Sequence, residues 1–200
     1  MHTEIIMAGF GGQGVLLAGQ LLALAGMAEG QNVTWYPSYG AEMRGGTANC
    51  SVIISDKQIG MPLINRADIV LAFNQPSIDA FVRRVAPGGA LIYNSSLGRE
   101  PEDHFDIDIT GVQANQLASQ AGSVKAVNLV MLSAALKLTG ILSRESLVKA
   151  LKLKFKGPKE KLIALNLKAV DLGWESVTSH KLPAKYEAAA CLIKDQTTPC

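Results

Sequence analysis

The sequence predicts an α/β fold, with a largely parallel sheet flanked by helices and a helical C-terminal half. Three observations lead to this prediction. The chain has 200 residues, of which 48% are hydrophobic and 18% charged, so it can bury the core of one domain and is not intrinsically disordered. Short apolar runs alternate with helical patterns up to residue 110, and beyond that point helical patterns dominate.

The predicted strands are short runs rich in apolar and β-branched residues. The run at 67–73 is the clearest, and a turn at 74–77 follows it. Pro37 is expected to stop the second strand, and a turn at 87–89 to precede the fifth. The last strand alternates like an edge strand. The six predicted strands are residues 4–8, 33–36, 47–55, 67–73, 90–94 and 105–109.

The first predicted helix, at 15–28, is rich in leucine, alanine, glutamine and methionine, which favour helix. Gly30 follows it, in the position where glycine commonly ends a helix. The second helix is expected to begin near Pro76, because proline is tolerated in a first turn. The predicted helices are residues 15–28, 78–85, 112–120, 124–138, 143–154 and 159–172.

Composition excludes several functions. The 19 Lys and Arg against 17 Asp and Glu give a net charge of +2, too weak to predict nucleic-acid binding. An iron–sulfur cluster needs about four thiolates, so a chain with three cysteines (Cys50, Cys191 and Cys200) cannot ligate one alone. Cys50 lies in a predicted apolar strand and is expected to be an inert core thiol. The scattered histidines (His2, His104 and His180) predict no metal site.

The uncharged stretch at residues 5–28 is long enough to cross a bilayer, which takes about 20 apolar residues. It contains six glycines and two glutamines, however, and divides into a strand, a glycine turn and a helix. No basic residue precedes Arg44, whereas a signal peptide has a basic start. We therefore expect a soluble cytoplasmic protein with no membrane partner.

The segment Gly9-Phe10-Gly11-Gly12-Gln13-Gly14 matches the pattern G-x-G-x-x-G between a predicted strand and a predicted helix. Such glycines allow a tight turn and the close approach of a phosphate to the helix N-terminus. We expect a methyl group at Gly11 or Gly14 to clash or to strain the backbone. The dinucleotide fingerprint also requires an acidic residue about 20 positions on, but the segment between Glu29 and Glu42 contains none. Three interpretations stay open: a packing turn, a loop facing another anion, and NAD(P) binding.

A second glycine-rich segment, Tyr39-Gly40-Ala41-Glu42-Met43-Arg44-Gly45-Gly46, contains the first basic residue of the chain. Glycines beside Arg44 allow a tight fold that presents the guanidinium in a fixed direction, which suits a carboxylate or a phosphate. The alternative is a surface ion pair between Arg44 and Glu42. Loops after strands converge on the ligand crevice of an α/β sheet, so we expect this segment near the glycine loop.

Four segments together resemble one family in order and spacing: GFGGQGV at 9–15, YPSYGAEMRGGTANCSVIIS at 36–55, ADIVLAFNQPS at 67–77, and the helix that contains Asn128. The family is the gamma subunit, or gamma domain, of the 2-oxoacid:ferredoxin oxidoreductases. The resemblance implies a Rossmann-like domain over residues 1–175, and leaves residues 176–200 as a C-terminal appendage without a counterpart.

The resemblance also implies a subunit that is inactive alone, in a complex that decarboxylates a 2-oxoacid on thiamine diphosphate, sends electrons through iron–sulfur clusters to ferredoxin, and forms an acyl-coenzyme A. Thiamine-binding and ferredoxin-like subunits are the expected partners, and they are expected to hold the thiamine diphosphate and the clusters. This chain is expected to hold no cofactor alone, no metal and no catalytic residue, and to border the coenzyme A side of the active site. The positions singled out for binding are Gly9, Gly11, Gly12, Gln13, Gly14, Tyr39, Glu42, Arg44, Gly45, Gly46 and Asn74.

Within the family, the sequence is most similar to the 2-oxoglutarate enzymes, with pyruvate, branched-chain and indolepyruvate enzymes as alternatives. A free-standing Rossmann-like nucleotide-binding protein is an alternative of a different class. The segment 144–168 has a net charge of +6. It is interpreted as a solvated helical face, with coenzyme A phosphates or an acidic partner such as ferredoxin as the other possibilities. Its one aromatic residue, Phe155, gives no support to nucleic-acid binding.

Overall fold

The computed structural model describes residues 1–39, 47–102 and 106–177. These residues form a six-stranded sheet with the strand order β2-β3-β1-β4-β5-β6. The strands are β1 (His2–Phe10), β2 (Asn32–Tyr39), β3 (Thr47–Ser55), β4 (Ala67–Ala72), β5 (Val85–Asn94) and β6 (Asp108–Val112).

The sheet is mixed. Strands β1, β4, β5 and β6 pair in parallel, in that order. Strand β3 runs antiparallel to both of its neighbours, β1 and β2. The prediction of a largely parallel sheet is therefore confirmed for the β1–β4–β5–β6 part, while β3 lies in the opposite direction between β1 and β2.

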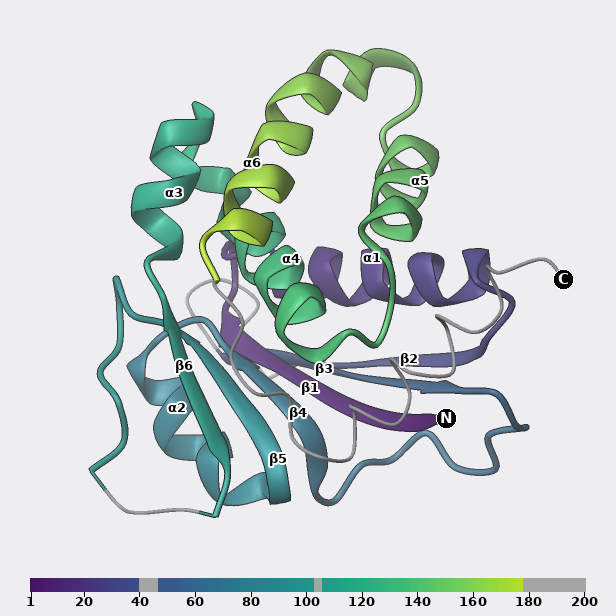
Figure 1. The fold of residues 1–200 in the computed structure, drawn as a ribbon, viewed down its shortest axis with the longest axis vertical. Coiled ribbons are helices and arrows are strands. Elements are labelled where there is room, and N and C mark those ends of the chain that lie inside the picture. Colours follow the sequence, from purple (N-terminus) through teal and green to yellow (C-terminus); the bar gives the residue numbers. More distant parts are fainter. Residues whose placement is uncertain (40–46, 103–105, 178–200) are drawn as a thin grey trace, which may run out of the picture.

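Helices cover both faces of this sheet (Figure 1). Of the described α-helices, α1, α3, α4, α5 and α6 pack on one face, and α2 packs on the other face, against β4 and β1. None of the described helices combines the length and the apolar character that a membrane span requires. The α-helices are α1 (Val15–Ala28), α2 (Gln75–Phe81), α3 (Ala114–Ala121), α4 (Val127–Thr139), α5 (Arg144–Lys154) and α6 (Ile163–Glu175), and the short 3-10 helices are η1 (Val82–Arg84), η2 (Val124–Ala126) and η3 (Gly157–Leu162).

Two apolar clusters fill the space between these layers. The larger joins the sheet to the five-helix layer and includes Ile5, Leu21 and Met131. The smaller joins the sheet to α2 and includes Ile6 and Ile78. Neighbouring residues such as Ile5 and Ile6 enter different clusters because successive side chains of a strand point to opposite faces. Strand β4 is buried on both faces, which explains the continuous apolar run from Ile69 to Ala72.

Several predicted elements agree closely with the structure. The strand at 47–55 and the helix at 15–28 coincide with β3 and α1. Gly30 follows α1 with a φ of 75°, in the left-handed region that lets glycine end a helix. The stretch at 129–138, within α4, is mostly buried and contributes to the larger core cluster.

The prediction that Pro37 stops the second strand is wrong. Strand β2 continues through Pro37, which lies opposite Cys50 of β3, and ends at Tyr39. Because β2 is the edge strand of the sheet, the missing N–H of a proline can face away from β3 without breaking the ladder.

The predicted turns at 74–77 and 87–89 are also wrong. Helix α2 begins at Gln75 because Asn74 caps it, its Oδ1 accepting the Ser77 N–H at 3.0 Å. Strand β5 begins at Val85 and includes residues 87–89, where its pairing with β4 is irregular. The predicted edge strand at 105–109 lies at 108–112, as β6.

Candidate functional site

The candidate site begins where β1 turns into α1, at residues 9–14 (the glycine loop). The Gln13 N–H donates to the Phe10 carbonyl at 3.1 Å and closes the turn. Gly12 and Gly14 have φ values of 101° and 76°, a region that only glycine adopts readily. Helix α1 has neither a side-chain cap nor an acidic residue in its first turn. Its N-terminal N–H groups therefore face a position that suits an anion.

Two glycines of this segment are also required by space. A Cβ on Gly9 would lie 2.7 Å from Cγ2 of Val15, and a Cβ on Gly14 would lie 2.7 Å from Nδ2 of Asn128. The Asn128 Nδ2 also donates to the Gly14 carbonyl at 3.3 Å. Helix α4 thereby fixes the residue from which α1 starts, and the expectation that Gly14 accepts no methyl group is confirmed.

The expectation of backbone strain at Gly11 is wrong. Gly11 is not among the glycines with positive φ; that conformation falls on Gly12, one residue later. Both residues are exposed, and a Cβ on Gly12 would meet no atom within 4 Å. Gly12 is thus required by conformation alone, whereas Gly14 is required by conformation and by space.

Gln13 ties the glycine loop to the end of β4. Its Oε1 accepts the Phe10 N–H at 2.7 Å and the Asn74 Nδ2 at 2.8 Å, and its Nε2 donates to the Phe73 carbonyl at 3.3 Å. Asn74 is 4% exposed and uses its other amide atom to cap α2. The predicted site residues Gln13 and Asn74, which lie 61 positions apart in the sequence, therefore make direct contact.

The same carbonyl connects a second pair of amides. Asn94, the fully buried last residue of β5, donates through Nδ2 to the Phe73 carbonyl at 3.4 Å and to Oδ1 of Asn115 at 2.9 Å. Gln13, Asn74, Asn94 and Asn115 form an amide network along the carboxyl ends of β1, β4 and β5. No member of this network titrates, so its chemistry is to hold the sheet edge and the glycine loop in place.

The second glycine-rich segment begins at the same edge. Tyr39 pairs with Ala48 of β3, and Phe10 pairs with the preceding residue, Thr47. Strands β2 and β1 therefore end at the same edge of the sheet, on either side of β3. The expected convergence is confirmed for these strand ends. Residues 40–46, which include Glu42, Arg44, Gly45 and Gly46, lie outside the described residues, and their place near the glycine loop stays a prediction.

The strand order explains why the dinucleotide fingerprint is incomplete. That fingerprint places its acidic residue at the end of a second strand that is the direct parallel neighbour of the first. Here β3 separates β1 from β2, so the end of β2 is two strand spacings, about 9–10 Å, from β1. A side chain at the end of β2 is therefore displaced from the usual ribose position, which disfavours NAD(P).

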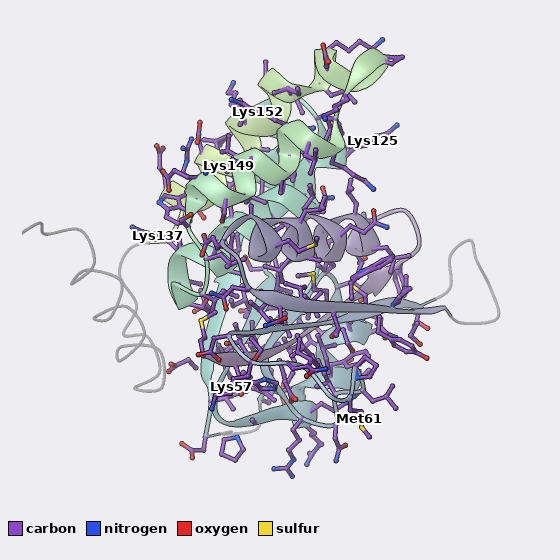
Figure 2. All side chains as sticks on the ribbon, turned by 90° about the vertical axis from the view of Figure 1, so that its right-hand side faces the viewer. Lys57, Met61, Lys125, Lys137, Lys149 and Lys152 are labelled. Carbon is purple, nitrogen blue, oxygen red and sulfur yellow. The ribbon has the colours of Figure 1, made fainter. Side chains whose placement is uncertain are left out.

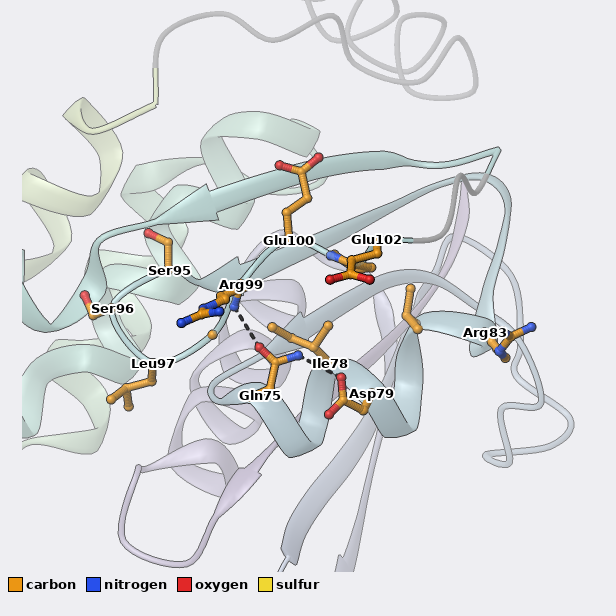
Figure 3. Close-up of a pocket in the computed structure, with 13 residues that line it drawn as sticks. Gln75, Ile78, Asp79, Arg83, Ser95, Ser96, Leu97, Arg99, Glu100 and Glu102 are labelled. Atoms are coloured by element: carbon orange, nitrogen blue, oxygen red, sulfur yellow. Dashed lines mark hydrogen bonds between the residues drawn. The ribbon is translucent and has the colours of Figure 1, made fainter.

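A groove of about 940 Å³ adjoins the amide network on the α2 face. It lies between α2 and the segment 95–102, and Figure 3 shows Arg99, Gln75 and Asp79 along it. The Arg99 N–H donates to Oε1 of Gln75 at 2.8 Å, and Nε2 of Gln75 donates to Oδ1 of Asp79 at 2.7 Å. Gln75 and Ser95 directly follow Asn74 and Asn94, so the groove opens at the site edge.

The prediction that Cys50 is a buried core residue is confirmed. Cys50 is fully buried between β3 and α1, and burial raises the pKa of its thiol from 9.0 to about 12. This confirms a thiol that is inert at neutral pH. In the described part of the chain, no group of three or more His, Cys, Asp or Glu side chains could hold a metal ion.

Sequence reasoning missed Asn94 and Asn115 and the groove beside them. One signal was available: an amide residue follows or ends each of the parallel strands β1, β4 and β5, at the edge where ligands bind in α/β sheets. Asn128 was part of the family resemblance, but its contact with Gly14, 114 positions earlier, could not be read from its helix alone.

The sequence and the fold of this chain are both similar to those of known proteins. Residues 4–176 match the family described as pyruvate ferredoxin/flavodoxin oxidoreductase. The ketoisovalerate oxidoreductase subunit VorA of Methanothermobacter thermautotrophicus is 44% identical over 176 residues, which are 87% of this chain. The match spans 36% of that relative, so this chain corresponds to about a third of its length.

Two solved structures share the fold. The gamma subunit of a keto/oxoacid ferredoxin oxidoreductase from Geobacter sulfurreducens superposes with a TM-score of 0.78 and 31% identity, covering 88% of this chain and 96% of that one. The second is a 2-oxoglutarate:ferredoxin oxidoreductase from Magnetococcus marinus, bound to 2-oxoglutarate, coenzyme A and succinyl-CoA. It superposes with a TM-score of 0.79 and 26% identity, covering 90% of this chain and 32% of that one. The chain belongs to the pyruvate ferredoxin/flavodoxin oxidoreductase family.

Proposed function

We propose that this chain is the gamma subunit of a multi-subunit 2-oxoacid:ferredoxin oxidoreductase. The observation that carries the proposal is the extent of the match: the family covers residues 4–176, and the similar gamma subunit from Geobacter sulfurreducens is covered over 96% of its length. The reaction is the coenzyme A-dependent oxidative decarboxylation of a 2-oxoacid to an acyl-coenzyme A and carbon dioxide, with electrons passed to ferredoxin.

The proposed division of labour places the redox chemistry on partner chains. Thiamine diphosphate supplies the carbanion chemistry of decarboxylation, and iron–sulfur clusters carry the electrons. The described part of this chain offers no metal-binding cluster of side chains, and its amide network contains no titratable group. Its residues are therefore assigned to binding and positioning.

Within that assignment, the glycine loop is the part that meets coenzyme A. The exposed Gly11 and Gly12 and the uncapped start of α1 suit a phosphate, because helix N–H groups and the helix dipole both favour negative charge there. The space that a Cβ on Gly14 would fill is already taken by Asn128, so the backbone itself forms the surface of this turn. Arg44 is proposed to add the cationic contact from the neighbouring segment.

The substrate is proposed to be 2-oxoglutarate or a branched-chain 2-oxoacid. The resemblance in motifs favours 2-oxoglutarate, and one similar structure is an enzyme bound to that acid. The branched-chain alternative is supported by the higher identity with the ketoisovalerate subunit, 44% against 34% for the 2-oxoglutarate synthase subunit KorC of Methanocaldococcus jannaschii. The thiamine-binding subunits are expected to make most of this choice.

Reconstitution tests the function. The chain is co-expressed with the thiamine-binding and ferredoxin-like subunits that we expect to be encoded beside it. Reduction of methyl viologen is then measured with coenzyme A and each of four acids: 2-oxoglutarate, 2-ketoisovalerate, pyruvate and indolepyruvate. We expect turnover that requires this chain and coenzyme A. A monomer that assembles with none of these subunits and binds a nucleotide in calorimetry would instead support the free-standing binding protein.

A further inference from the structure

The charges of this chain are unevenly distributed along the sequence. Residues 1–120 contain six Lys and Arg against eleven Asp and Glu, a net charge of −5. Residues 121–200 contain thirteen against six, a net charge of +7. The small overall charge of +2 is therefore the sum of an acidic N-terminal part and a basic C-terminal part.

The basic charge gathers at the outer end of the helical layer. Five exposed lysines, which we call the lysine surface, follow each other along α5 and into η3: Lys149, Lys152, Lys154, Lys156 and Lys161. The turn that joins α5 to α6 is the part of the helical layer furthest from the sheet (Figure 1). Figure 2 shows Lys149 and Lys152 on this layer and Lys57 at the opposite end of the molecule.

The fold directs these lysines outward. Helix α5 buries Leu147, Ala150 and Leu151 in the larger core cluster. Positions three and four residues apart share one side of a helix, so Lys149, Lys152 and Leu153 lie together on the outer side.

The lysine surface is not neutralised within the described residues. Arg144, at the start of α5, pairs with Asp171 of α6, and this hydrogen bond raises the pKa of the guanidinium. None of the five lysines forms a comparable ion pair among the residues that the structure describes. Two exposed leucines accompany them in the sequence: Leu153, between Lys152 and Lys154, is 53% exposed, and Leu162, directly after Lys161, is 40% exposed.

These properties favour a protein partner that binds reversibly. Lysine is depleted from the cores of permanent interfaces, whereas unpaired surface charge increases the rate of encounter with an oppositely charged protein. Nucleic acid is disfavoured because the one aromatic residue of the segment 144–168, Phe155, is only 9% exposed and offers no stacking surface. A membrane surface is disfavoured because the apolar side of α5 is already buried.

We propose that the lysine surface is a docking site for an acidic protein that binds and leaves during turnover, namely the electron-accepting ferredoxin. This inference rests on the proposed function, because only an assembled oxidoreductase reduces such a carrier. It concerns a surface distinct from the glycine loop: the lysines lie on α5 and η3, whereas the loop lies at the carboxyl end of β1.

A charge-reversal pair in the reconstituted complex tests the proposal. The variant Lys152→Glu/Lys156→Glu is compared with Lys57→Glu/Arg66→Glu, an exposed pair elsewhere that gives the same charge change. The KM for purified ferredoxin and the rate with methyl viologen are measured at about 20 and 300 mM salt. At low salt we expect the first variant to raise the ferredoxin KM about 3- to 10-fold, since charge complementarity governs encounter. At high salt the difference is expected to shrink as screening increases.

Two further variants separate charge from structure. Lys152→Arg/Lys156→Arg keeps the charge and is expected to keep the ferredoxin KM. Leu153→Ala is expected to raise it at both salt concentrations, because an apolar contact is not screened. In every variant the methyl viologen rate is expected to stay within twofold of the wild type.

Three results would overturn the proposal: an unchanged ferredoxin KM in the reversal variant, an equal rise in the Lys57→Glu/Arg66→Glu control, or loss of subunit assembly, which would make this surface a permanent interface. Binding of phosphatidylserine vesicles or duplex DNA that depends on Lys152 and Lys156, with an unchanged ferredoxin KM, would assign the surface to those ligands instead. A wild-type complex inactive with methyl viologen contradicts the proposed function, and calorimetry of the full chain with ferredoxin then tests the docking site directly.

Discussion

Nδ2 of Asn74 donates a hydrogen bond of 2.8 Å to Oε1 of Gln13, across 61 positions of sequence. This contact joins the turn after β1 to the start of α2, and each residue has a further role: Gln13 accepts the Phe10 N–H, and Asn74 caps α2. The glycine loop is thus held by a side chain whose position depends on the neighbouring parallel strand.

Loss of the Gln13 side chain should lower the stability of the chain. Gln13→Ala removes three hydrogen bonds, each worth a net 0.5–1.5 kcal/mol, so we expect the free energy of unfolding to fall by about 2–3 kcal/mol. A double-mutant cycle with Asn74→Ala should show a coupling of about 1 kcal/mol. Urea denaturation of the four chains measures both quantities. Strictly additive losses would mean that the contact contributes nothing.

The three central glycines should respond differently to a methyl group. Gly12→Ala forces a left-handed alanine into open space and should destabilise the chain by about 1–2 kcal/mol. Gly14→Ala adds a clash with Asn128 and should cost about 1–3 kcal/mol more. Gly11→Ala, without positive φ, should avoid the left-handed penalty. Thermal and urea unfolding measure the series.

Asn128→Ala provides the control for the clash. Combined with Gly14→Ala it should recover the steric part of the loss and leave only the conformational part. Equal effects of Gly14→Ala in the presence and absence of the Asn128 side chain would contradict the packing assigned to this turn.

Arg44 is expected to contact an anionic group of coenzyme A or the 2-oxoacid in the assembled enzyme. Loss of a charge-assisted pair costs about 1.5–3 kcal/mol, so Arg44→Ala should change the affected kinetic constant roughly 10- to 150-fold. Arg44→Lys keeps the charge without the two-pronged geometry and should recover only part of the loss. Steady-state kinetics with coenzyme A and 2-oxoacid varied separately measures this. If Arg44→Ala leaves the kinetic constants unchanged, the alternative of a surface ion pair between Arg44 and Glu42 is supported instead.

The isolated chain is expected to show no oxidoreductase activity, no bound thiamine diphosphate and no iron. It has three cysteines, one fewer than a cluster needs, and Cys50 is fully buried. Anaerobic reconstitution with iron and sulfide, followed by absorbance at about 400 nm, is the measurement. A stoichiometric cluster in the purified chain would overturn this expectation.

Cys50 should resist thiol reagents and respond to alkaline pH. Burial holds its folded-state pKa at about 12 against an ordinary value of 9.0. The stability from the neutral buried thiol is therefore complete below pH 9 and is lost as the pH rises toward 12. In a Cys191→Ser/Cys200→Ser chain, Cys50 should react with a thiol reagent at pH 8 only after unfolding. Cys50→Ala should reduce the loss of stability per pH unit above pH 9.

The sequence predicted what local patterns determine. Helix α1 and strand β3 were placed to the residue because helix formers, Gly30 and β-branched runs act over a few positions. The insertion of β3 between β1 and β2, antiparallel to both, was not predicted, because strand pairing is a property of distant segments. For the same reason Pro37 was placed outside a strand that, at the sheet edge, tolerates it.

The candidate site was likewise predictable from the sequence only in part. The glycine loop and Asn74 were found from spacing and from family resemblance, and their contact through Gln13 follows the rule that parallel strands end at one edge. Asn94 shares only the general signal of an amide at a strand end, and its direct hydrogen bond to Asn115, at the start of α3, depends on the tertiary fold. Gly11 and Gly12 could not be distinguished without the path of the backbone.

The strand order also makes the N-terminus a condition for folding. In the described sheet, β1 is the strand that hydrogen-bonds to both β3 and β4, so the backbone ladders of β2–β3 and of β4–β5–β6 join through residues 2–10. The β2–β3 pairing is local, whereas β1 must find partners whose centres lie more than 40 residues away. A truncation that removes β1 would therefore divide the sheet into two separate fragments, and a slow folding step is expected where β1 inserts between them.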